Sequence, residues 1–371
     1  MKITPTLFRY LMRTYLGHVA MLLIVLLGIV YLFDTVELLR RAGKYEGVSA
    51  GLVLQMSFLK LPEVGQVLFP FVILFSAMYT IWQLTKRSEL AIVRASGFSV
   101  WQFLAPIIMV SITLGFAHMM IINPLSSVFL GKYEKMERRY LSRKGEDNQI
   151  AIFREGLWLR QAYEDKNSGK GYVIVHAPTV SQKGWTLQSP MGVFFNQDDE
   201  FVRRIDAQKA VLKPGYWEFH EAILHRGSHE RETGAAYTLP TKLTPQDVEE
   251  SFSSPESMSF WRLPSHIQTL ENAGFSADRL RVQHQNLLSQ PLMLTAMVLL
   301  AAMVSMRLPR ANGGMFLLGI GVFCGFAVFF FTSYVQALGA GGQIPVLLAA
   351  WSPAVISLLI GLSVLMRLED G

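Results

Sequence analysis

Two clusters of basic side chains mark places where apolar stretches of this sequence give way to polar ones. The first cluster consists of Arg40, Arg41 and Lys44, and the second of Lys132, Lys135, Arg139 and Arg143, with Arg138 beside them. The second cluster recurs at the three- and four-residue spacing that puts side chains on one face of a helix. Guanidinium and ammonium groups bind phosphate through their charge and several hydrogen-bond donors. The pattern therefore favours a site for phosphorylated groups.

Acidic neighbours supply an alternative, in which local ion pairs neutralise both clusters. The neighbours are Asp34, Glu37, Glu134 and Glu137. Proteins that bind single-stranded nucleic acid combine basic grooves with aromatic stacking surfaces, which do not accompany these clusters. A phosphorylated lipid is therefore a better ligand for them than a nucleic acid.

Catalytic motifs are missing from the sequence. Gly43-Lys44-Tyr45 and Gly169-Lys170-Gly171 lack the spacing and the hydroxyl of a phosphate-binding loop. His220, His225 and His229 occur without the spacing of a zinc site, so we interpret them as strand and loop residues. We expect a protein that is not an enzyme and that binds no metal or cofactor of its own.

The composition indicates a membrane protein. Hydrophobic residues make up 51% of the 371 residues and charged residues only 17%, against about a quarter charged in soluble domains. Cys324, the single cysteine, excludes an internal disulfide. A span needs about 20 apolar residues. Runs of this kind lie near Leu16–Phe33, Val64–Leu84, Phe98–Ile122, Pro291–Met306, Met315–Val335 and Pro345–Met366.

Basic residues in the short loops predict the orientation. They are Lys2, Arg9 and Arg13 before the first span, Lys86, Arg87 and Arg94 after the second, Arg307 and Arg310 after the fourth, and Arg367 after the sixth. The loop Gln336–Gln343 has no charge. Both termini are therefore expected in the cytoplasm, with the segment between the third and fourth spans outside.

That outer segment has the pattern of a β domain. Strand-like stretches separated by turn residues lie at Gln149–Phe153, Leu157–Ala162, Tyr172–His176, Trp185–Gln188, Gly192–Asn196, Arg203–Leu212 and Tyr216–His225. Short strands at this spacing predict a sandwich, a jelly roll or an open barrel. Two helices, Ser265–Gly274 and Ser276–Ser289, would lead back to the membrane. The expected fold class is an α-helical polytopic membrane protein, with spans arranged three plus three around an inserted all-β, jellyroll-like domain.

The segment Leu84–Gly97, between the second and third spans, predicts a short amphipathic helix. Arg87, Leu90, Ala91 and Arg94 would share one side, and Glu89, Ile92, Val93 and Ser96 the other. Such a helix can lie on the membrane surface, insert into a soluble partner, or form an ordinary cytoplasmic loop.

The fifth span and His118 carry two further features. Gly321 and Gly325 form a G-x-x-x-G pair that lets another helix approach closely. The phenylalanines of this span suit either a packed, lipid-facing helix or the wall of a cavity for acyl chains. His118, inside the third span, is expected to make a hydrogen bond between helices rather than to act in transport.

Several motifs in this order resemble the permeases of lipopolysaccharide export, the LptF/LptG family, with the LptG branch closer. They are Leu68-Phe69-Pro70, Arg87-Ser88-Glu89-Leu90, Ala95-Ser96-Gly97-Phe98, Gln290-Pro291-Leu292 and Leu365-Met366-Arg367. The resemblance covers almost the whole chain, although it is weaker in the outer domain. It implies a subunit of an ATP-binding cassette exporter in the inner membrane of a Gram-negative bacterium.

The resemblance also implies partners. These are a homologous LptF-like permease, two copies of an LptB-like ATPase that binds ATP and Mg, and an LptC-like periplasmic jellyroll protein. The segment 84–97 would be the coupling helix that contacts the ATPase. Its expected contact residues are Arg87, Glu89, Leu90, Val93, Arg94 and Gly97.

Lipopolysaccharide would be the substrate. Its phosphates would bind Arg40, Arg41, Lys44, Lys132, Lys135 and Arg139, and its acyl chains would contact Tyr31, Phe326, Phe329 and Phe330. Some relatives have a basic residue where this chain has Tyr31, which indicates a different head-group charge in its substrate. The implied domains are 1–123 (membrane part), 124–263 (periplasmic β domain) and 264–371 (linker helices and membrane part).

Two other functions remain compatible with the sequence. One is a permease that releases lipoproteins, although that type usually has four spans and a differently placed outer domain. The other is a relay that passes ATPase motion to a periplasmic partner without transport.

Overall fold

The structure is a computed structural model that describes residues 5–45, 48–141, 157–165, 169–181, 186–196, 200–226, 230–241, 255–272, 276–307 and 314–369. The chain forms two compact units. The helical unit comprises Met1–Leu141, Pro255–Leu263 and Asp278–Gly371, and the β unit comprises Ser142–Ser254 and Pro264–Ala277. Each unit is described by itself below.

Among the described residues, six helices are long and apolar enough to cross a membrane, which confirms the expected number of spans. They comprise α1 (Pro5–Ala42), α2 (Ala50–Lys86), α4 (Val100–Ala117) continued by η1 (His118–Ile122) and α5 (Asn123–Tyr140), α8 (Asp278–Arg307), α9 (Gly314–Ala340) and α10 (Val346–Glu369). Most of them extend well past the apolar runs seen in the sequence. A helix satisfies its backbone hydrogen bonds internally, so it continues into polar sequence beyond the apolar core.

Local signals fix where several of these helices begin and end. The Ser49 hydroxyl accepts a hydrogen bond from the Leu52 N–H at 3.3 Å at the start of α2. Ser99 and Gln102 form a capping box at the start of α4, with both hydrogen bonds 3.2 Å long. After α9, Gly342 adopts a φ of +70°, which glycine tolerates better than other residues.

Helix α8 packs at the centre of the helical unit, where it contacts α2, α4 and α10. The core formed there includes Leu294, Val298 and Ala301, which are fully buried. At Gly115 of α4, an added Cβ would lie 2.5 Å from Cα of Pro291 in α8. Only glycine permits this approach, so α4 and α8 lie in direct backbone contact.

In its described ranges the β unit forms a nine-stranded antiparallel sheet that is nearly barrel-shaped. Its strands are β1 (Leu157–Asp165), β2 (Gly169–Ala177), β3 (Thr179–Ser181), β4 (Thr186–Gln188), β5 (Met191–Asn196), β6 (Phe201–Asp206), β7 (Lys209–Lys213), β8 (Tyr216–Arg226) and β9 (Glu230–Pro240). The strands follow the order β1-β2-β5-β6-β8-β7-β4-β3, with β9 paired to β8. The core inside includes Phe194, Trp217 and Phe219. The expected fold class is therefore confirmed.

The pairing of strand β8 accounts for the largest difference between the predicted and the observed strands. We expected one strand at Arg203–Leu212, but β6 and β7 are separate and pair with different halves of the same edge of β8. Glu221, between these halves, has a φ of +54° that interrupts the regular strand. Strand β9 was not predicted, because it lacks an alternating apolar pattern. The expected strand Gln149–Phe153 lies outside the described residues.

The two expected linker helices are present with different bounds. The first is α7 (Leu263–Asn272). The second is the start of α8, which runs without a break from Asp278 into the fourth span. The β unit begins at Ser142, since α5 belongs to the helical unit.

Candidate functional site

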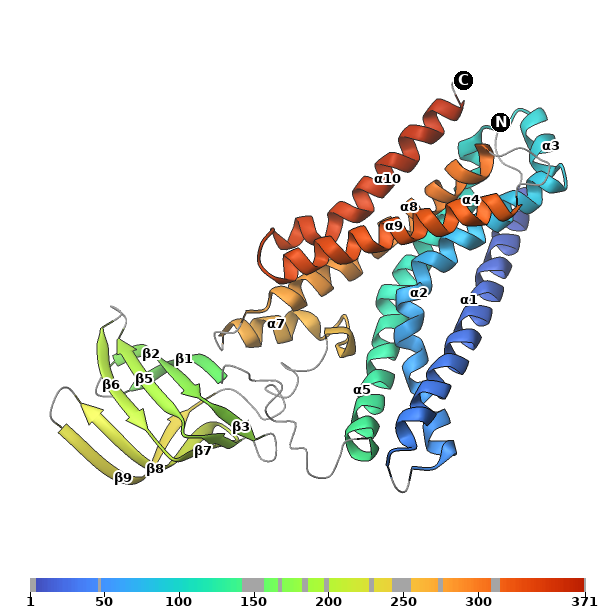
Figure 1. The fold of residues 1–371 in the computed structure, drawn as a ribbon. Helices are drawn as coiled ribbons and strands as arrows, with labels where there is room; N and C mark the ends of the chain where they lie inside the picture. Colours follow the sequence, from blue (N-terminus) through green and yellow to red (C-terminus); the bar gives the residue numbers. More distant parts are fainter. Residues whose placement is uncertain are drawn as a thin grey trace. The chain divides into compact units, whose positions relative to one another are not determined.

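The segment between α2 and α4 contains a seven-residue helix, α3 (Glu89–Ala95). A residue with positive φ lies on each side of it, Ser88 at 62° and Gly97 at 83°. These left-handed residues let the chain turn sharply out of α2 and back into α4. The sequence therefore folds here into a compact helix at one end of the membrane helices (Figure 1).

The faces of α3 differ from the pairing expected from the sequence. Leu90 and Val93 both pack against the membrane core, although we placed them on opposite sides. Ile92 is 63% exposed, and Arg94 is exposed as well. A spacing of three residues brings Leu90 and Val93 to one face of the helix, which leaves the opposite face available to a partner.

Glu89 attaches α3 to α1. The Tyr10 hydroxyl donates a hydrogen bond to Glu89 Oε2 at 2.9 Å. Arg87 Nη1 lies 4.0 Å from Glu89 Oε1. Within the described part of the chain, Arg94 makes no hydrogen bond or ion pair. Arg94 thus carries a charge without a partner among the described residues, whereas Glu89 attaches the helix to α1.

The first basic cluster is largely neutralised by acidic neighbours. Arg40 donates two hydrogen bonds to Glu37, of 2.9 and 2.7 Å. Arg41 forms a 2.6 Å ion pair with Glu137, which links α1 to α5. For these two arginines, the structure contains the local ion pairs that the sequence left as an alternative. Lys44 is exposed in the turn that follows α1.

The second basic cluster lies on an exposed face of α5. Lys132, Lys135 and Arg139 are all exposed. Among the residues that the structure describes, none of the three forms a salt bridge. The Arg139 guanidinium lies 5.6 Å from the centroid of the Tyr140 ring. This face of α5 therefore carries positive charge without an ion pair in the described part of the chain, while Arg143 and the side chain of Arg138 lie outside it.

The expected acyl-chain residues lie where α9 and α1 meet α2. Phe326 and Phe329 of α9 pack against Phe71 of α2, with ring centroids 5.7 and 5.8 Å apart. Phe330 points outward and is exposed. The Tyr31 hydroxyl donates to the Leu54 carbonyl of α2 at 3.4 Å. The structure therefore joins Tyr31, Phe326 and Phe329 to α2, while Phe330 packs on Phe326 within α9.

Glycines set the distance between α9 and α2. An added Cβ at Gly321 would lie 2.6 Å from Met78 Sδ, and one at Gly325 would lie 3.0 Å from Phe71 Cδ1. Both atoms belong to α2. The close helix approach expected from the G-x-x-x-G pair is therefore present, with α2 as the neighbour.

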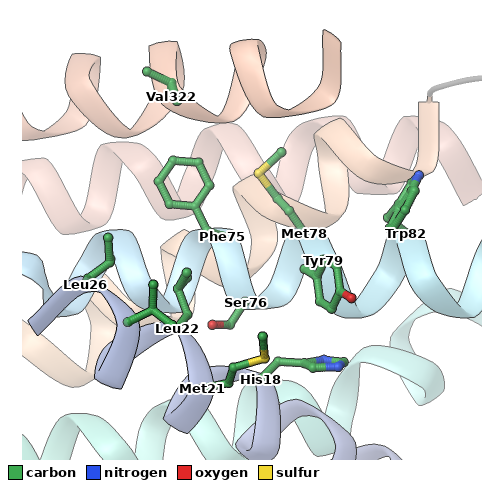
Figure 2. A pocket seen from close by; sticks show the side chains of 11 residues that line it. His18, Met21, Leu22, Leu26, Phe75, Ser76, Met78, Tyr79, Trp82 and Val322 are labelled. Carbon is green, nitrogen blue, oxygen red and sulfur yellow. The ribbon is translucent and has the colours of Figure 1, made fainter. Parts of the chain in front are cut away.

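A cavity of about 570 Å³ lies between α1, α2 and α9, in a region where no sequence motif predicted a site. Its lining consists of His18, Met21, Leu22, Val25, Leu26, Phe75, Ser76, Met78, Tyr79, Trp82 and Val322 (Figure 2). None of the four predicted acyl-chain residues lines it. His18, a polar residue inside the first apolar run, is the sequence feature that could have indicated a site in this region.

Histidines elsewhere make no metal site among the described residues. His225 Nε2 lies 3.4 Å from Asp206 Oδ2, and His220 Nε2 lies 3.6 Å from Glu218 Oε2. His229 falls outside the described residues. His118 is buried in η1 against the Phe69 ring, 5.2 Å away between centroids. Neither of its ring nitrogens has a hydrogen-bond partner in the described part of the chain, contrary to the expected bond between helices.

Comparison with known proteins decides the family. The profile described as "Lipopolysaccharide export system permease LptF/LptG" matches residues 9–367. The chain belongs to the LptF/LptG permease family. It is 22% identical to the lipopolysaccharide export system permease protein LptG of Escherichia coli K12 over 368 residues, 97% of each chain. It is 23% identical to LptG of Haemophilus influenzae over 310 residues, 80% of each chain.

The family defines what kind of subunit this permease is. It is a multi-pass membrane protein of lipopolysaccharide export and the transmembrane part of the transporter, with ATP hydrolysis residing in a partner chain. The match spans both groups of helices and the inserted β unit. The resemblance noted from the sequence motifs is therefore confirmed.

Proposed function

We propose that this permease extracts lipopolysaccharide from the periplasmic leaflet of the bacterial inner membrane and passes it to a periplasmic bridge. The family match over residues 9–367 is the observation that carries the proposal. The short-loop charges support an orientation with α3 and both termini in the cytoplasm. In this orientation α5 and the end of α1 lie toward the periplasm, as does the β unit.

Helix α3 is the proposed contact with the ATPase. Leu90, Val93 and Glu89 hold it to the membrane helices, while Ile92 and Arg94 are presented outward. A rigid attachment of this kind transmits motion, because a displacement of the exposed face moves α2 and α4 with it. Ser88 and Gly97 then serve as the turn residues that flank the coupling helix, and Arg87 caps the end of α2 just before it.

The exposed basic face of α5 is the proposed contact with substrate phosphates. Lys132, Lys135 and Arg139 have no salt bridge among the described residues, and Lys44 is exposed in the turn after α1. Arg40 and Arg41, which are paired with glutamates, would contribute mainly by holding the helix ends. Phosphate binding at this end would position the lipid before its chains leave the bilayer.

Acyl chains are proposed to contact the outer parts of α1 and α9 around Tyr31, Phe326, Phe329 and Phe330. Exposing a lipid chain to water costs about 0.8 kcal/mol per CH₂ group. An apolar surface lowers this cost, and ATP hydrolysis in the partner supplies the remainder. Exposed apolar side chains along α1 and α9 also suit a homologous LptF-like permease, which would complete the path.

The remaining partners follow from the same proposal. Two copies of an LptB-like ATPase, with ATP and Mg, would bind α3 and its counterpart in the second permease. An LptC-like jellyroll protein would continue the β unit, whose strands β1, β3 and β9 each pair with a single neighbour among the described residues. End strands carry unpaired backbone groups that can add a strand from another chain.

Photocrosslinking tests the transport path. A photoreactive amino acid at Phe326 or Phe330 should form adducts with lipopolysaccharide in membranes. Ile356 of α10 is the matched control, because it is also apolar and exposed but lies on another helix. Equal labelling from all three positions would reflect contact with bulk lipid and would contradict a specific path along α9.

A further inference from the structure

The cavity between α1, α2 and α9 has a polar end and an apolar end. His18, Tyr79 and Trp82 lie at one end, while Leu26, Phe75 and Val322 lie at the other (Figure 2). Helix α2 leads from Trp82 toward α3, so the polar end lies on the α3 side of the helices. In the orientation proposed above this is the cytoplasmic side, away from the outer basic cluster on α5.

A buried hydroxyl in the cavity wall lacks a partner. The Thr80 hydroxyl donates to the Ser76 carbonyl at 2.6 Å, so its single proton is committed and His18 Nδ1 must donate to it at 2.8 Å. Ser76 is only 1% exposed, and its Oγ has no hydrogen bond within the described residues. Figure 2 shows this oxygen directed toward the side chains of α1. Unpaired buried polar groups are rare, so a ligand oxygen here would satisfy one.

A positive charge stands next to the polar end. The Lys86 ammonium lies 5.1 Å from the centroid of the Trp82 ring, which itself lines the cavity. Arg87 follows in the sequence and is exposed. A ligand that extends out of the polar end therefore meets two basic residues, whereas its inner end meets aliphatic and aromatic groups only. This is the chemistry of a phospholipid aligned with its phosphate toward the cytoplasm.

We propose that the cavity binds one acyl chain of a phospholipid from the cytoplasmic leaflet. Its phosphate would lie near Lys86, an ester oxygen would accept the Ser76 hydroxyl proton, and the chain would fill the space beside Leu22 and Leu26. A volume of about 570 Å³ falls within the usual range for small-molecule sites, roughly 300–1,000 Å³. The polar end of the cavity lies on the α3 side, whereas its apolar end adjoins the proposed acyl-chain contacts, because Val322 is four residues from Phe326 on α9.

The test uses the full chain with its co-purified subunits in nanodiscs. Phosphatidylglycerol with a photoreactive diazirine in one acyl chain should label peptides containing Met21–Leu26 and Phe75–Trp82. Val25→Trp should abolish this labelling, because Val25 lines the cavity and is 47% exposed, so that a larger ring can enter the space without disrupting the core. Ile24→Trp is the control, since Ile24 is 70% exposed and lies outside the lining. It should leave the labelling unchanged.

A second pair of variants tests the hydroxyl. Ser76→Ala should lower the labelling, whereas Ser57→Ala should not, although Ser57 is another buried α2 serine without a described partner. Equal labelling in Val25→Trp and Ile24→Trp would overturn the proposal. So would labelling of these peptides by diazirine-bearing lipopolysaccharide but not by phosphatidylglycerol, because the cavity would then belong to the substrate path. Both results are independent of crosslinking at Phe326, which tests the export path itself.

Discussion

At the scale of single residues, a charged side chain of the proposed coupling segment, Glu89, forms a hydrogen bond within its own chain and is therefore not free to bind a partner. Glu89 accepts a hydrogen bond from the Tyr10 hydroxyl, 79 positions earlier in the sequence, and this bond attaches α3 to the start of α1. Arg94, five positions later, has no such attachment among the described residues. We therefore divide the expected contacts into residues that hold α3 and residues that face the ATPase.

Tyr10→Phe should loosen α3 without unfolding the protein. A hydrogen bond of this kind is worth about 1 kcal/mol, which corresponds to roughly fivefold faster local opening. Hydrogen exchange of the Glu89–Ala95 amides in detergent or nanodiscs measures this directly. Tyr334→Phe on the exposed face of α9 is the control. Unchanged exchange in Tyr10→Phe would show that Glu89 does not hold the helix.

Sequence reasoning found the residue types at these sites but not their partners. The motif Arg87-Ser88-Glu89-Leu90 indicated the coupling segment, yet no local pattern indicates Tyr10 as the partner of Glu89. The same holds for Arg41 and Glu137, which are 96 residues apart. The cavity beside His18 requires three helices at once, and apolar periodicity does not specify which faces of long helices meet. Such contacts depend on packing, so they appear only in the structure.

At the scale of elements, close packing of α9 on α2 depends on glycine. Gly321→Leu should destabilise the helical unit by about 1–3 kcal/mol, the usual cost of overpacking, because its side chain would displace Met78. Gly319→Leu is a matched control, since an added Cβ there meets nothing within 4 Å. Thermal unfolding in detergent compares the two variants. Equal melting temperatures would mean that α9 does not rely on this contact.

If the basic face of α5 binds phosphates, the binding of lipopolysaccharide should depend on ionic strength. Replacing Lys132, Lys135 and Arg139 by glutamine should weaken the capture of lipopolysaccharide most at low ionic strength. The difference from the original protein should shrink in high salt, because screening weakens these contacts in both proteins. Binding measured from low salt to about 1 M, where the Debye length is about 3 Å, tests this, with Lys209→Gln on the β unit as the control. An identical loss at every salt concentration would indicate a structural role.

Elements were predicted more reliably than their lengths. The six spans follow from runs of apolar residues, and the β unit follows from its turns and alternating strands. The lengths of the helices were underestimated, because polar residues can continue a helix as long as its backbone hydrogen bonds are made. Strands β6 and β7 were merged in the prediction, because the break at Ala207 and Gln208 contains neither glycine nor proline.

At the scale of the whole molecule, the chain combines several features expected of one transport subunit. An anchored helix exposes Ile92 and Arg94 at one end of the helical unit, and an exposed basic face lies on α5. Helices α1 and α9 expose apolar side chains, and the sheet of the β unit has end strands. The family match covers all of these parts, which supports our proposal that they act along one export path.

Transfer of lipopolysaccharide from proteoliposomes to a periplasmic acceptor protein tests the central claim most directly. The vesicles would contain the chain with its co-purified ATPase and second permease. With ATP present, the original protein should transfer lipid, and Ile92→Glu/Arg94→Glu should lose transfer while Phe326 still crosslinks to lipopolysaccharide. Transfer by the double variant at the original rate, or transfer without ATP, would contradict the account of α3 as the coupling helix.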